Sequence, residues 1–347
     1  MSIYFDALAF FWAFFVSVFA IPSIIKAAHT KMLLDEPNGR ALHLNSTPRL
    51  GGLAIFAGFI SSLTLFGQID KGIRELMAGA IIIFFIGLKD DIVSVSAFKK
   101  VFVQILAAGI VIFSGDIYLS DFYGVLGIYE ISAGWGYLFT FICIIGLTNA
   151  INLIDGLDGL AGSIVVIAGS FLGAGFLIWG VGGGTYSVVA FALVGAVLGF
   201  LKFNLRDATI FMGDTGSLVS GFIISVMAIC FIEARPLPYA PVFVIAVLFV
   251  PIVDTFRVIV LRLLNGKSPF LADKNHLHHR LIGLGFSQPA VLMAMIGGNL
   301  GSVALVVRFS YLSNNELLSL LLGYALFIIT IVEFFYKRRR ARISELI

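Results

Sequence analysis

The stretch from residue 136 to residue 162 reads GYLFTFICIIGLTNAINLIDGLDGLAG. Up to residue 154 it carries no charged side chain, and a helix of about 20 such residues crosses the ~30 Å hydrocarbon layer of a membrane. The run ends with two amides, Asn149 and Asn152, and then opens into Asp155 and Asp158. Charged groups beside hydrocarbon are costly and usually mark a functional site or an ion path. The stretch therefore predicts a membrane-spanning helix with a functional end.

The rest of the chain has the same character. Of its 347 residues, 59% are hydrophobic and 12% are charged, with a mean hydropathy of +1.03, which excludes a soluble globular protein. We predict an all-α integral membrane protein that forms a single polytopic membrane domain over residues 1–347. About eleven apolar runs are long enough to span the membrane: 5–25, 50–68, 74–90, 99–115, 136–154, 163–181, 185–203, 214–232, 241–263, 290–308 and 316–336.

The distribution of basic residues predicts the orientation of these spans, because Lys and Arg beside spanning helices stay in the cytoplasm. With the N-terminus outside, all of the 23 Lys and Arg except Lys71, Arg74, Arg235 and Arg308 fall on cytoplasmic segments. We therefore expect a multi-pass protein of the inner (cytoplasmic) membrane with a cytoplasmic C-terminus. Residues 26–49 and 264–289 are then cytoplasmic loops, and we expect both to contribute to a site on that face.

Five aspartates fall at the cytoplasmic edge in this topology. They are Asp90, Asp91, Asp155, Asp158 and Asp214. The segments 203–206 and 273–280 add amides, histidines and arginines on the same side. Carboxylates suit Mg²⁺, which usually binds one or two of them together with substrate phosphates. Helix N-termini and glycine-rich turns offer N–H groups to those phosphates. Together these parts predict a site for a metal-bound diphosphate at the membrane surface.

Each motif also has an ordinary structural interpretation. The Asp90–Asp91 pair is compatible with surface charge at a helix end, and Asp214 with a helix N-cap. Asn149 and Asn152 lie on nearly one helical face, where they would hydrogen-bond between helices. The turn from residue 155 to 159 is rich in Asp and Gly, which favour tight turns anywhere. The occurrence of all these motifs on one side of the membrane favours a shared site.

Asp254 and Arg257 stand apart from this group. They lie three residues apart in the run 241–263, just after Pro251. Such spacing favours a local ion pair that reduces the cost of both charges. A contribution to the floor of the site is the alternative, because the pair lies close to the cytoplasmic face.

The motifs, taken in order, resemble the polyprenyl-phosphate N-acetylhexosamine-1-phosphate transferases. The resemblance covers nearly the whole chain: residues 35–52, Asp90–Asp91, residues 149–162, residues 211–217 and the His276–Arg280 segment. Two positions depart from the family pattern. Ser94 stands where a further Asp is common, and Asp207 stands where a Pro is common.

The resemblance implies an enzyme that transfers N-acetylglucosamine 1-phosphate from its UDP derivative to a polyprenyl (undecaprenyl) phosphate, releasing UMP. The product would be the lipid-linked diphosphate sugar that starts cell-envelope polysaccharide synthesis. The His-x-His-His-Arg form is similar to that of enzymes using UDP-N-acetylglucosamine, whereas the branch using UDP-N-acetylmuramoyl-pentapeptide typically has three consecutive histidines. Another UDP-N-acetylhexosamine, or the muramoyl donor, is the alternative substrate. A transporter or lipid flippase is the alternative of another class.

The resemblance also implies roles for residues. Asp214 is the expected Mg²⁺ ligand, with Mn²⁺ as an alternative metal. Asp90, Asp91, Asp155 and Asp158 are the expected catalytic residues, and either member of the first pair is a candidate base. The expected substrate-binding residues are His43, Asn149, Asn152, Asn204, His276, His278, His279 and Arg280. The expected partners are the UDP-sugar, the lipid phosphate, the membrane and a second copy in a homodimer, with no nucleic acid.

Overall fold

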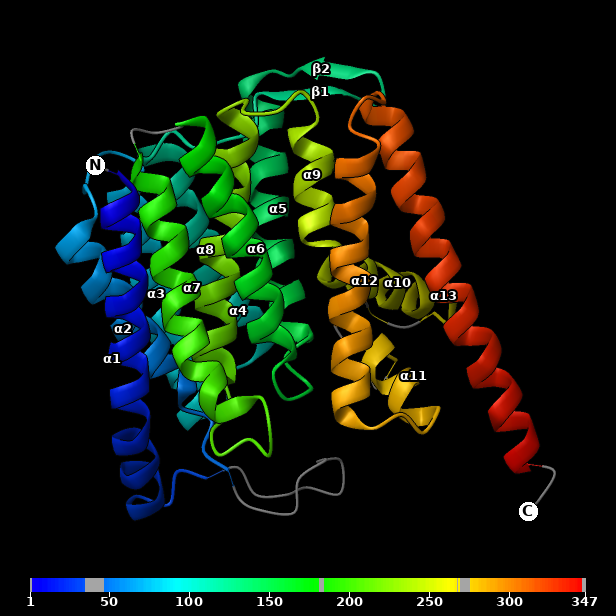
Figure 1. Ribbon diagram of the computed structural model, residues 1–347, viewed down its shortest axis with the longest axis horizontal. Helices are drawn as coiled ribbons and strands as arrows, with labels where there is room; N and C mark the ends of the chain where they lie inside the picture. Colours follow the sequence, from blue (N-terminus) through cyan, green and yellow to red (C-terminus); the bar gives the residue numbers. More distant parts are fainter. Residues whose placement is uncertain (1, 35–46, 181–183, 267, 269–274, 345–347) are drawn as a thin grey trace. The chain divides into compact units, whose positions relative to one another are not determined.

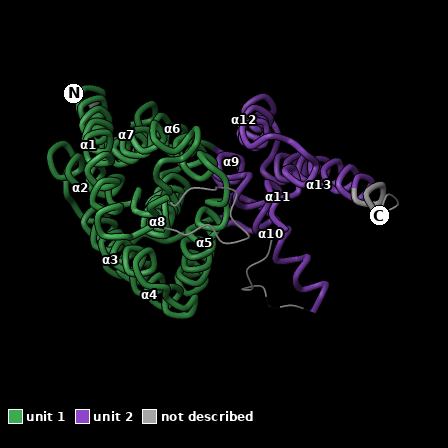
Figure 2. Tube along the Cα trace, turned by 90° about the horizontal axis from the view of Figure 1, so that it is seen from below, with its two compact units in different colours: residues 1–121, 131–237 green, residues 122–130, 238–347 purple. Residues whose placement is uncertain are grey.

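The computed structural model describes residues 2–34, 47–180, 184–266, 268 and 275–344. The chain divides into two compact units (Figure 2). The first unit comprises residues 1–121 and 131–237, and the second comprises residues 122–130 and 238–347. Both consist mainly of α-helices. A short hairpin of β1 (Asp121–Val125) and β2 (Ile128–Glu130) is an addition to the predicted all-α fold.

The first unit is a helical bundle (Figure 1). Its helices are α1 (Ser2–Thr30), α2 (Gly51–Phe66), α3 (Ile73–Ile92), α4 (Ala97–Gly109) with the π-helical turn η1 (Ile110–Ser114), α5 (Ala133–Leu153), α6 (Leu160–Trp179), α7 (Thr185–Asn204) and α8 (Gly213–Glu233). The core of the bundle is α8, which packs against α2, α3, α5, α6 and α7. Within the apolar part of α8, 94% of the residues are buried.

Small residues allow two helices to approach the start of α8 closely. A Cβ atom on Gly52 of α2 would lie 2.2 Å from the backbone nitrogen of Gly216. A Cβ atom on Gly87 of α3 would lie 2.6 Å from the Cα of Thr215. Any larger residue would force these helices apart, since real Cβ contacts are longer. This packing brings the end of α3, with its two aspartates, against the first turn of α8.

The second unit contains α9 (Ala240–Val247), α10 (Phe249–Leu264), α11 (Leu277–Gly283), α12 (Gln288–Arg308) and α13 (Asn314–Ser344). Helix α12 packs against α9, α10, α11 and α13. The start of α13 holds the β-hairpin of the same unit. The amide of Asn314 donates to the carbonyl of Tyr123 at 2.8 Å, and the amide of Asn315 donates to that of Gly124 at 3.0 Å.

The continuous helix predicted over residues 241–263 is wrong. The chain bends by 78° between α9 and α10. Pro251 explains the position of the bend, because a proline ring clashes with the carbonyl four residues earlier, here that of Val247. Asn299 of α12 satisfies the interrupted backbone. Its amide donates to the carbonyl of Val247 at 2.9 Å, and its oxygen accepts the N–H of Val250 at 3.0 Å.

In the described part of the chain, eight helices are long and apolar enough to cross a membrane, or nine if the bent pair counts as one span. Helices α2 and α3 are not among these eight, because α2 is apolar but has only 16 residues and α3 ends in charged residues. All eleven predicted ranges nevertheless contain helix. The protein is therefore a predominantly helical, multi-pass integral membrane protein. Its description as a single domain stays a prediction.

Candidate active site

Asp91 caps the first turn of α8. One oxygen of its carboxylate accepts the backbone N–H of Asp214 at 2.7 Å, and the other accepts the N–H of Thr215 at 2.9 Å. The Thr215 hydroxyl donates to the same carboxylate. The first N–H groups of a helix have no partners within it, so an acceptor at this place stabilises the helix. The structural alternative for Asp214, a helix N-cap, is wrong, because Asp91 of α3 accepts these N–H groups.

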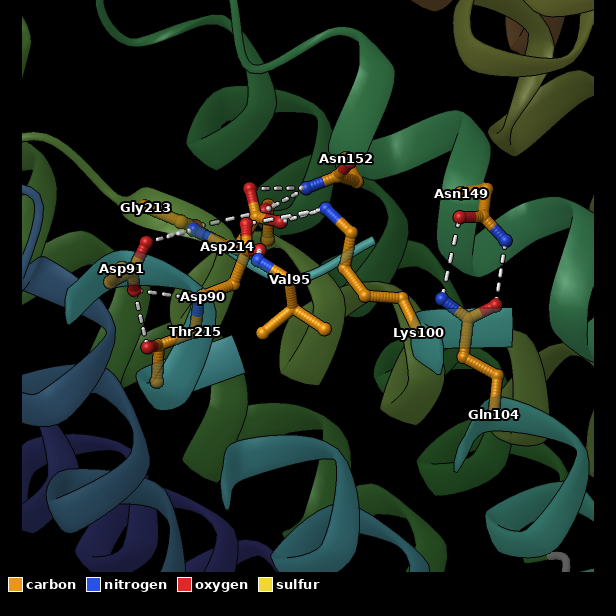
Figure 3. A network of polar contacts seen from close by, with 11 residues as sticks. Asp90, Asp91, Val95, Lys100, Gln104, Asn149, Asn152, Gly213, Asp214 and Thr215 are labelled. Atoms are coloured by element: carbon orange, nitrogen blue, oxygen red, sulfur yellow. Dashed lines mark hydrogen bonds and ion pairs between the residues drawn. The ribbon is translucent and has the colours of Figure 1, made fainter. Parts of the chain in front are cut away.

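The carboxylate of Asp214 is thereby free to face side chains from other helices (Figure 3). The ammonium of Lys100, on α4, lies 2.6 Å from its Oδ2. The amide of Asn152, at the end of α5, donates to its Oδ1 at 3.2 Å and to the Ser217 hydroxyl at 2.8 Å. The structure thus brings Asp214 and Asn152 together, as predicted, and adds a lysine.

Asp90 also contacts Lys100. Its Oδ2 is 3.3 Å from the Lys100 ammonium, and its Oδ1 accepts the N–H of Val95 at 2.5 Å. The second contact closes the turn between α3 and α4. Asp90 and Asp214 therefore share one cation, and this group of four residues, Asp90, Lys100, Asn152 and Asp214, is called the acidic cluster below.

The segment before α8 is held by the segment before α2. Backbone hydrogen bonds of 2.9 Å link Phe211 to Pro48, Gly51 to Phe211 and Gly52 to Met212. Two of the expected family motifs, residues 48–52 and 211–217, are thus neighbours in space. Gly213 follows with a φ of 71°, a conformation that favours glycine. This conformation sets the direction in which α8 begins, with Asp214 in its first turn.

Asp155 and Asp158 lie in the turn between α5 and α6. Burial, followed by the negative charges of Asp214 and Asp91, raises the pKa of Asp155 to about 8. Its carboxyl is therefore mostly neutral at pH 7. Asp158 accepts the N–H of Ala208 at 3.4 Å, which ties this turn to the loop before α8.

Two expected substrate-binding amides are engaged in the structure. Asn149 exchanges hydrogen bonds of 2.7 and 3.3 Å with the side chain of Gln104 on α4. Asn204 is buried, accepts the N–H of Gly159 at 2.8 Å and donates to the carbonyl of Ile210 at 2.9 Å. The contacts of Asn149 agree with its structural alternative, an amide that hydrogen-bonds between helices. The predicted role of both amides in binding is untested.

The histidine segment belongs to the second unit. His276 is buried, and its Nδ1 lies 2.8 Å from a carboxylate oxygen of Asp254. His278 is also buried, and neither of its ring nitrogens has a hydrogen-bond partner within the described residues. Burial, followed by the neighbouring His279, lowers the pKa of His278 to about 3. His278 is therefore neutral at physiological pH.

Arg280 is occupied by structural contacts. It donates to the side chain of Asn275 at 2.7 Å, lies 3.5 Å from Glu333 and stacks over the Tyr336 ring at 4.3 Å. These contacts attach α11 to α13. His43, the remaining predicted substrate-binding residue, lies outside the described residues.

The predicted ion pair between Asp254 and Arg257 is wrong. Asp254 pairs with His276, whereas Arg257 pairs with Glu333 of α13 and donates to the carbonyl of Asn275 at 2.6 Å. The reason is the position of residues 275–277, which pass alongside α10 and supply hydrogen-bond partners to both side chains.

Comparison with family models matches residues 73–232 to glycosyl transferase family 4. Over 305 residues, 85% of this chain and 84% of the relative, the sequence is 37% identical to a "probable undecaprenyl-phosphate N-acetylglucosaminyl 1-phosphate transferase" of Bacillus subtilis (strain 168). The chain belongs to glycosyl transferase family 4. It is also 30% identical over 296 residues to the undecaprenyl-phosphate alpha-N-acetylglucosaminyl 1-phosphate transferase of Escherichia coli (strain K12), covering 82% of this chain and 79% of that one. The enzyme of the same name in Yersinia pestis is 29% identical over 327 residues, which cover 90% of this chain and 89% of that one.

The matched region of this family 4 chain contains the whole acidic cluster, and the histidine segment lies beyond it. Two residues of the matched region were missed by the sequence reasoning. Lys100 and Gln104 contact Asp214 and Asn149, respectively. Their spacing of four on the apolar helix predicted over 99–115 was a usable signal, because it places both on one face.

Proposed function

We propose that this family 4 protein transfers N-acetylglucosamine 1-phosphate from UDP-N-acetylglucosamine to undecaprenyl phosphate and releases UMP. The observation that carries the proposal is the acidic cluster, in which a lysine and two aspartates meet at the first turn of the buried helix α8. The names of the relatives support both the lipid and the sugar. The product would start the synthesis of a cell-envelope polysaccharide.

The cluster suits phosphoryl transfer, in which catalysis is almost entirely positioning and charge stabilisation. The lipid phosphate oxygen would attack the phosphorus that carries the sugar. A new P–O bond forms there as the bond from that phosphorus to the oxygen retained by UMP breaks. Lys100 is placed to neutralise negative charge on the phosphates, and Asn152 orients the Asp214 carboxylate.

A catalytic base is not required for this step. A phosphate monoester has a second pKa of about 6, so the lipid phosphate is already largely ionised at neutral pH. Asp91 is engaged with two backbone N–H groups and a hydroxyl. We therefore assign Asp91 the role of positioning Asp214, and leave Asp90 as the member of the pair that faces the reacting groups.

We propose Mg²⁺ as the cofactor, with Mn²⁺ as the alternative, and Asp214 as its first protein ligand. In the described residues, no three His, Cys, Asp or Glu side chains are grouped to hold a metal ion by themselves. Asp214 and Asp90, which share the Lys100 ammonium in this structure, carry carboxylate oxygens of the kind that Mg²⁺ prefers. Mg²⁺ takes few protein ligands and completes its shell with water and substrate phosphates. When bound, the ion would neutralise the diphosphate and favour departure of UMP.

We further propose that all eleven helical ranges act as spans, with the N-terminus outside, the C-terminus in the cytoplasm and the active site on the cytoplasmic face of the inner membrane. The clustering of basic residues supports this orientation. Cysteine substitution tests it. A thiol at Lys26 should react with an impermeant reagent only from the cytoplasmic side, and one at Arg308 only from outside. The homodimer stays a prediction.

The decisive experiment uses purified protein, undecaprenyl phosphate, Mg²⁺ and several UDP-sugars. UDP-N-acetylglucosamine should yield UMP and a lipid-linked sugar diphosphate in equal amounts. Product formed only from the muramoyl-pentapeptide donor would contradict the sugar assignment. Lipid or sugar movement across vesicles without a covalent product would favour the transporter alternative.

A further inference from the structure

Helix α4, which carries Lys100, has few buried residues. Of the 13 residues that the structure describes in α4, only Gln104, Ala107 and Ala108 are buried. Between helices in a membrane the hydrophobic effect contributes little, because lipid tails are as apolar as the side chains. Small residues and hydrogen bonds between helices therefore determine how such helices pack. In α4 the small buried residues are the two alanines, and the buried polar residue is Gln104.

Gln104 forms a reciprocal amide pair with Asn149 of α5 (Figure 3). Its Oε1 accepts a hydrogen bond from the Asn149 amide at 2.7 Å, and its Nε2 donates to the Asn149 oxygen at 3.3 Å. The Asn149 amide also donates to the carbonyl of Ile145 in its own helix at 2.8 Å, which limits its rotation. Gln104 is 1% exposed, so solvent has little access to these bonds. The pair therefore holds α4 at one position along α5.

The Gln104–Asn149 pair lies about one helical turn from the acidic cluster on both helices. Lys100 precedes Gln104 by four residues on α4, which places both on nearly one face. Asn152 follows Asn149 by three residues on α5, with the same result. Lys100 and Asn152 both contact Asp214 of α8, at 2.6 and 3.2 Å. Polar contacts thus join three helices in a closed ring, α4 to α5, α5 to α8 and α8 to α4.

The contacts of Lys100 depend on where α4 places its backbone. A lysine side chain is long and flexible, so by itself it does not fix the position of its ammonium. In the structure that ammonium meets two carboxylates at once, Asp214 at 2.6 Å and Asp90 at 3.3 Å. A shift or rotation of α4 by a fraction of a turn would lengthen at least one of these contacts.

We propose that Gln104 is a positioning residue for the transfer reaction, which holds the Lys100 ammonium at Asp214 and Asp90 by fixing α4 against α5. The inference rests on the proposed function and deepens it. Gln104 would touch no substrate and would act only through Lys100. Asn149 acts here as the partner of Gln104.

The substitution Gln104→Leu removes the amide pair and keeps a side chain of similar size. We expect kcat/KM for UDP-N-acetylglucosamine to fall by about 10- to 100-fold, because misplacing a reacting group by about 1 Å costs up to about 100-fold. Insertion into the membrane should be unchanged, since leucine is more apolar than glutamine. Gln104→Asn, whose amide is one methylene shorter, should act in the same direction and replaces Gln104→Leu if that variant does not fold.

A double-mutant cycle tests whether Gln104 acts through Lys100. Gln104→Leu added to Lys100→Gln should cost less than about a further twofold in kcat/KM, because the group that it positions is already gone. Ser62→Ala is the matched control, since the buried Ser62 hydroxyl of α2 donates to the carbonyl of Ala9 in α1 at 2.7 Å and does not involve α4. Its effect should be the same in wild type and in Lys100→Gln. An effect of Gln104→Leu that multiplies with that of Lys100→Gln would overturn the proposal.

The reactivity of the Lys100 amine provides a readout that does not depend on activity. Its side chain is 22% exposed, so acetic anhydride can reach it, but in wild type two carboxylates hold the ammonium and should slow its acetylation. In Gln104→Leu the acetylation of Lys100 should be several-fold faster, whereas the exposed Lys99 should react at the wild-type rate. Mass spectrometry of the peptide that contains both lysines measures the two rates in one sample.

An unchanged rate of Lys100 acetylation in the Gln104 variant used, or an equal increase in Ser62→Ala, would contradict the proposal. Absence of UMP release from wild type with every UDP-sugar would contradict the proposed function instead, while the acetylation rates would still test how Gln104 positions Lys100.

Discussion

The ammonium of Lys100 lies 2.6 Å from a carboxylate oxygen of Asp214, although 114 positions separate the two residues in the chain. The same ammonium is 3.3 Å from Asp90. One cation therefore joins two acids from different helices, which would otherwise repel each other.

Replacing Lys100 should weaken transfer specifically. We expect Lys100→Gln to lower kcat/KM by about 100-fold, the usual effect of removing one preorganised donor from a site where negative charge develops. UMP release with varied UDP-N-acetylglucosamine measures the change. Lys99→Gln is the matched control, because its neighbour Lys99 is exposed and should tolerate the same loss of charge. Equal effects of the two variants would contradict a special role for Lys100.

Replacing Asp214 should remove both transfer and its dependence on metal. Asp214→Asn should reduce kcat by about 1,000-fold or more. This corresponds to a loss of about 4 kcal/mol of transition-state stabilisation, at about 1.4 kcal/mol for each tenfold change. Asp207→Asn, at an exposed position in the preceding loop, should leave the rate and the Mg²⁺ requirement intact. Both variants should insert into the membrane normally. Turnover near the wild-type rate in Asp214→Asn would exclude Asp214 as the metal ligand.

Replacing Asp91 distinguishes positioning from base catalysis. Asn offers one acceptor oxygen to the two N–H groups at the start of α8, so Asp91→Asn should lower unfolding stability by about 0.5–2 kcal/mol. It should also reduce kcat by a factor that is constant from pH 7 to pH 9. The rate–pH profile and thermal unfolding in detergent measure the two effects. Recovery of the rate at high pH would instead support Asp91 as a base.

His278 should make the protein sensitive to acid. Its folded-state pKa is lowered to about 3, whereas an exposed histidine titrates near 6.5. Below pH 6.5 the unfolded chain binds a proton that the folded protein does not. The stability that is fully present above 6.5 is therefore lost as the pH falls towards 3, by about 1.4 kcal/mol per pH unit.

Thermal unfolding between pH 7 and pH 5 measures this slope. His278→Leu should reduce it, and the exposed His29→Gln should not. An unchanged slope in His278→Leu would mean that other groups cause the acid sensitivity.

Asn299 should stabilise the break between α9 and α10. Asn299→Leu leaves the N–H of Val250 and the carbonyl of Val247 without their partner, and each such buried group costs about 1–3 kcal/mol. We expect a loss of roughly 2–5 kcal/mol in unfolding stability. The exposed Asn265→Ala should change it by less than about 0.5 kcal/mol. Equal stability of both variants would show that Pro251 alone maintains the bend.

Much of the fold was predictable, because helix formation in a membrane depends on the length and hydrophobicity of local runs. All eleven predicted ranges contain helix, including the two closely spaced ranges that correspond to α6 and α7. The bend at residue 248 was missed. Pro251 marks a candidate break, but a continuous kinked helix has the same sequence pattern. The outcome was decided by Asn299, which lies 49 positions after Val250 and satisfies the open backbone.

The sequence by itself determined the membrane class, the positions of the helices and the residue types gathered at the ends of those helices, since hydropathy and motif order are local properties of the chain. Only the tertiary structure decided the partner of each polar group. It made Asp91 a cap for α8, gave Asp214 a lysine and moved Asp254 from a local ion pair to His276. The reason is physical: a buried charge is stabilised by whichever partner the packing brings within hydrogen-bonding distance, and close helix packing brings together residues that are far apart in the sequence.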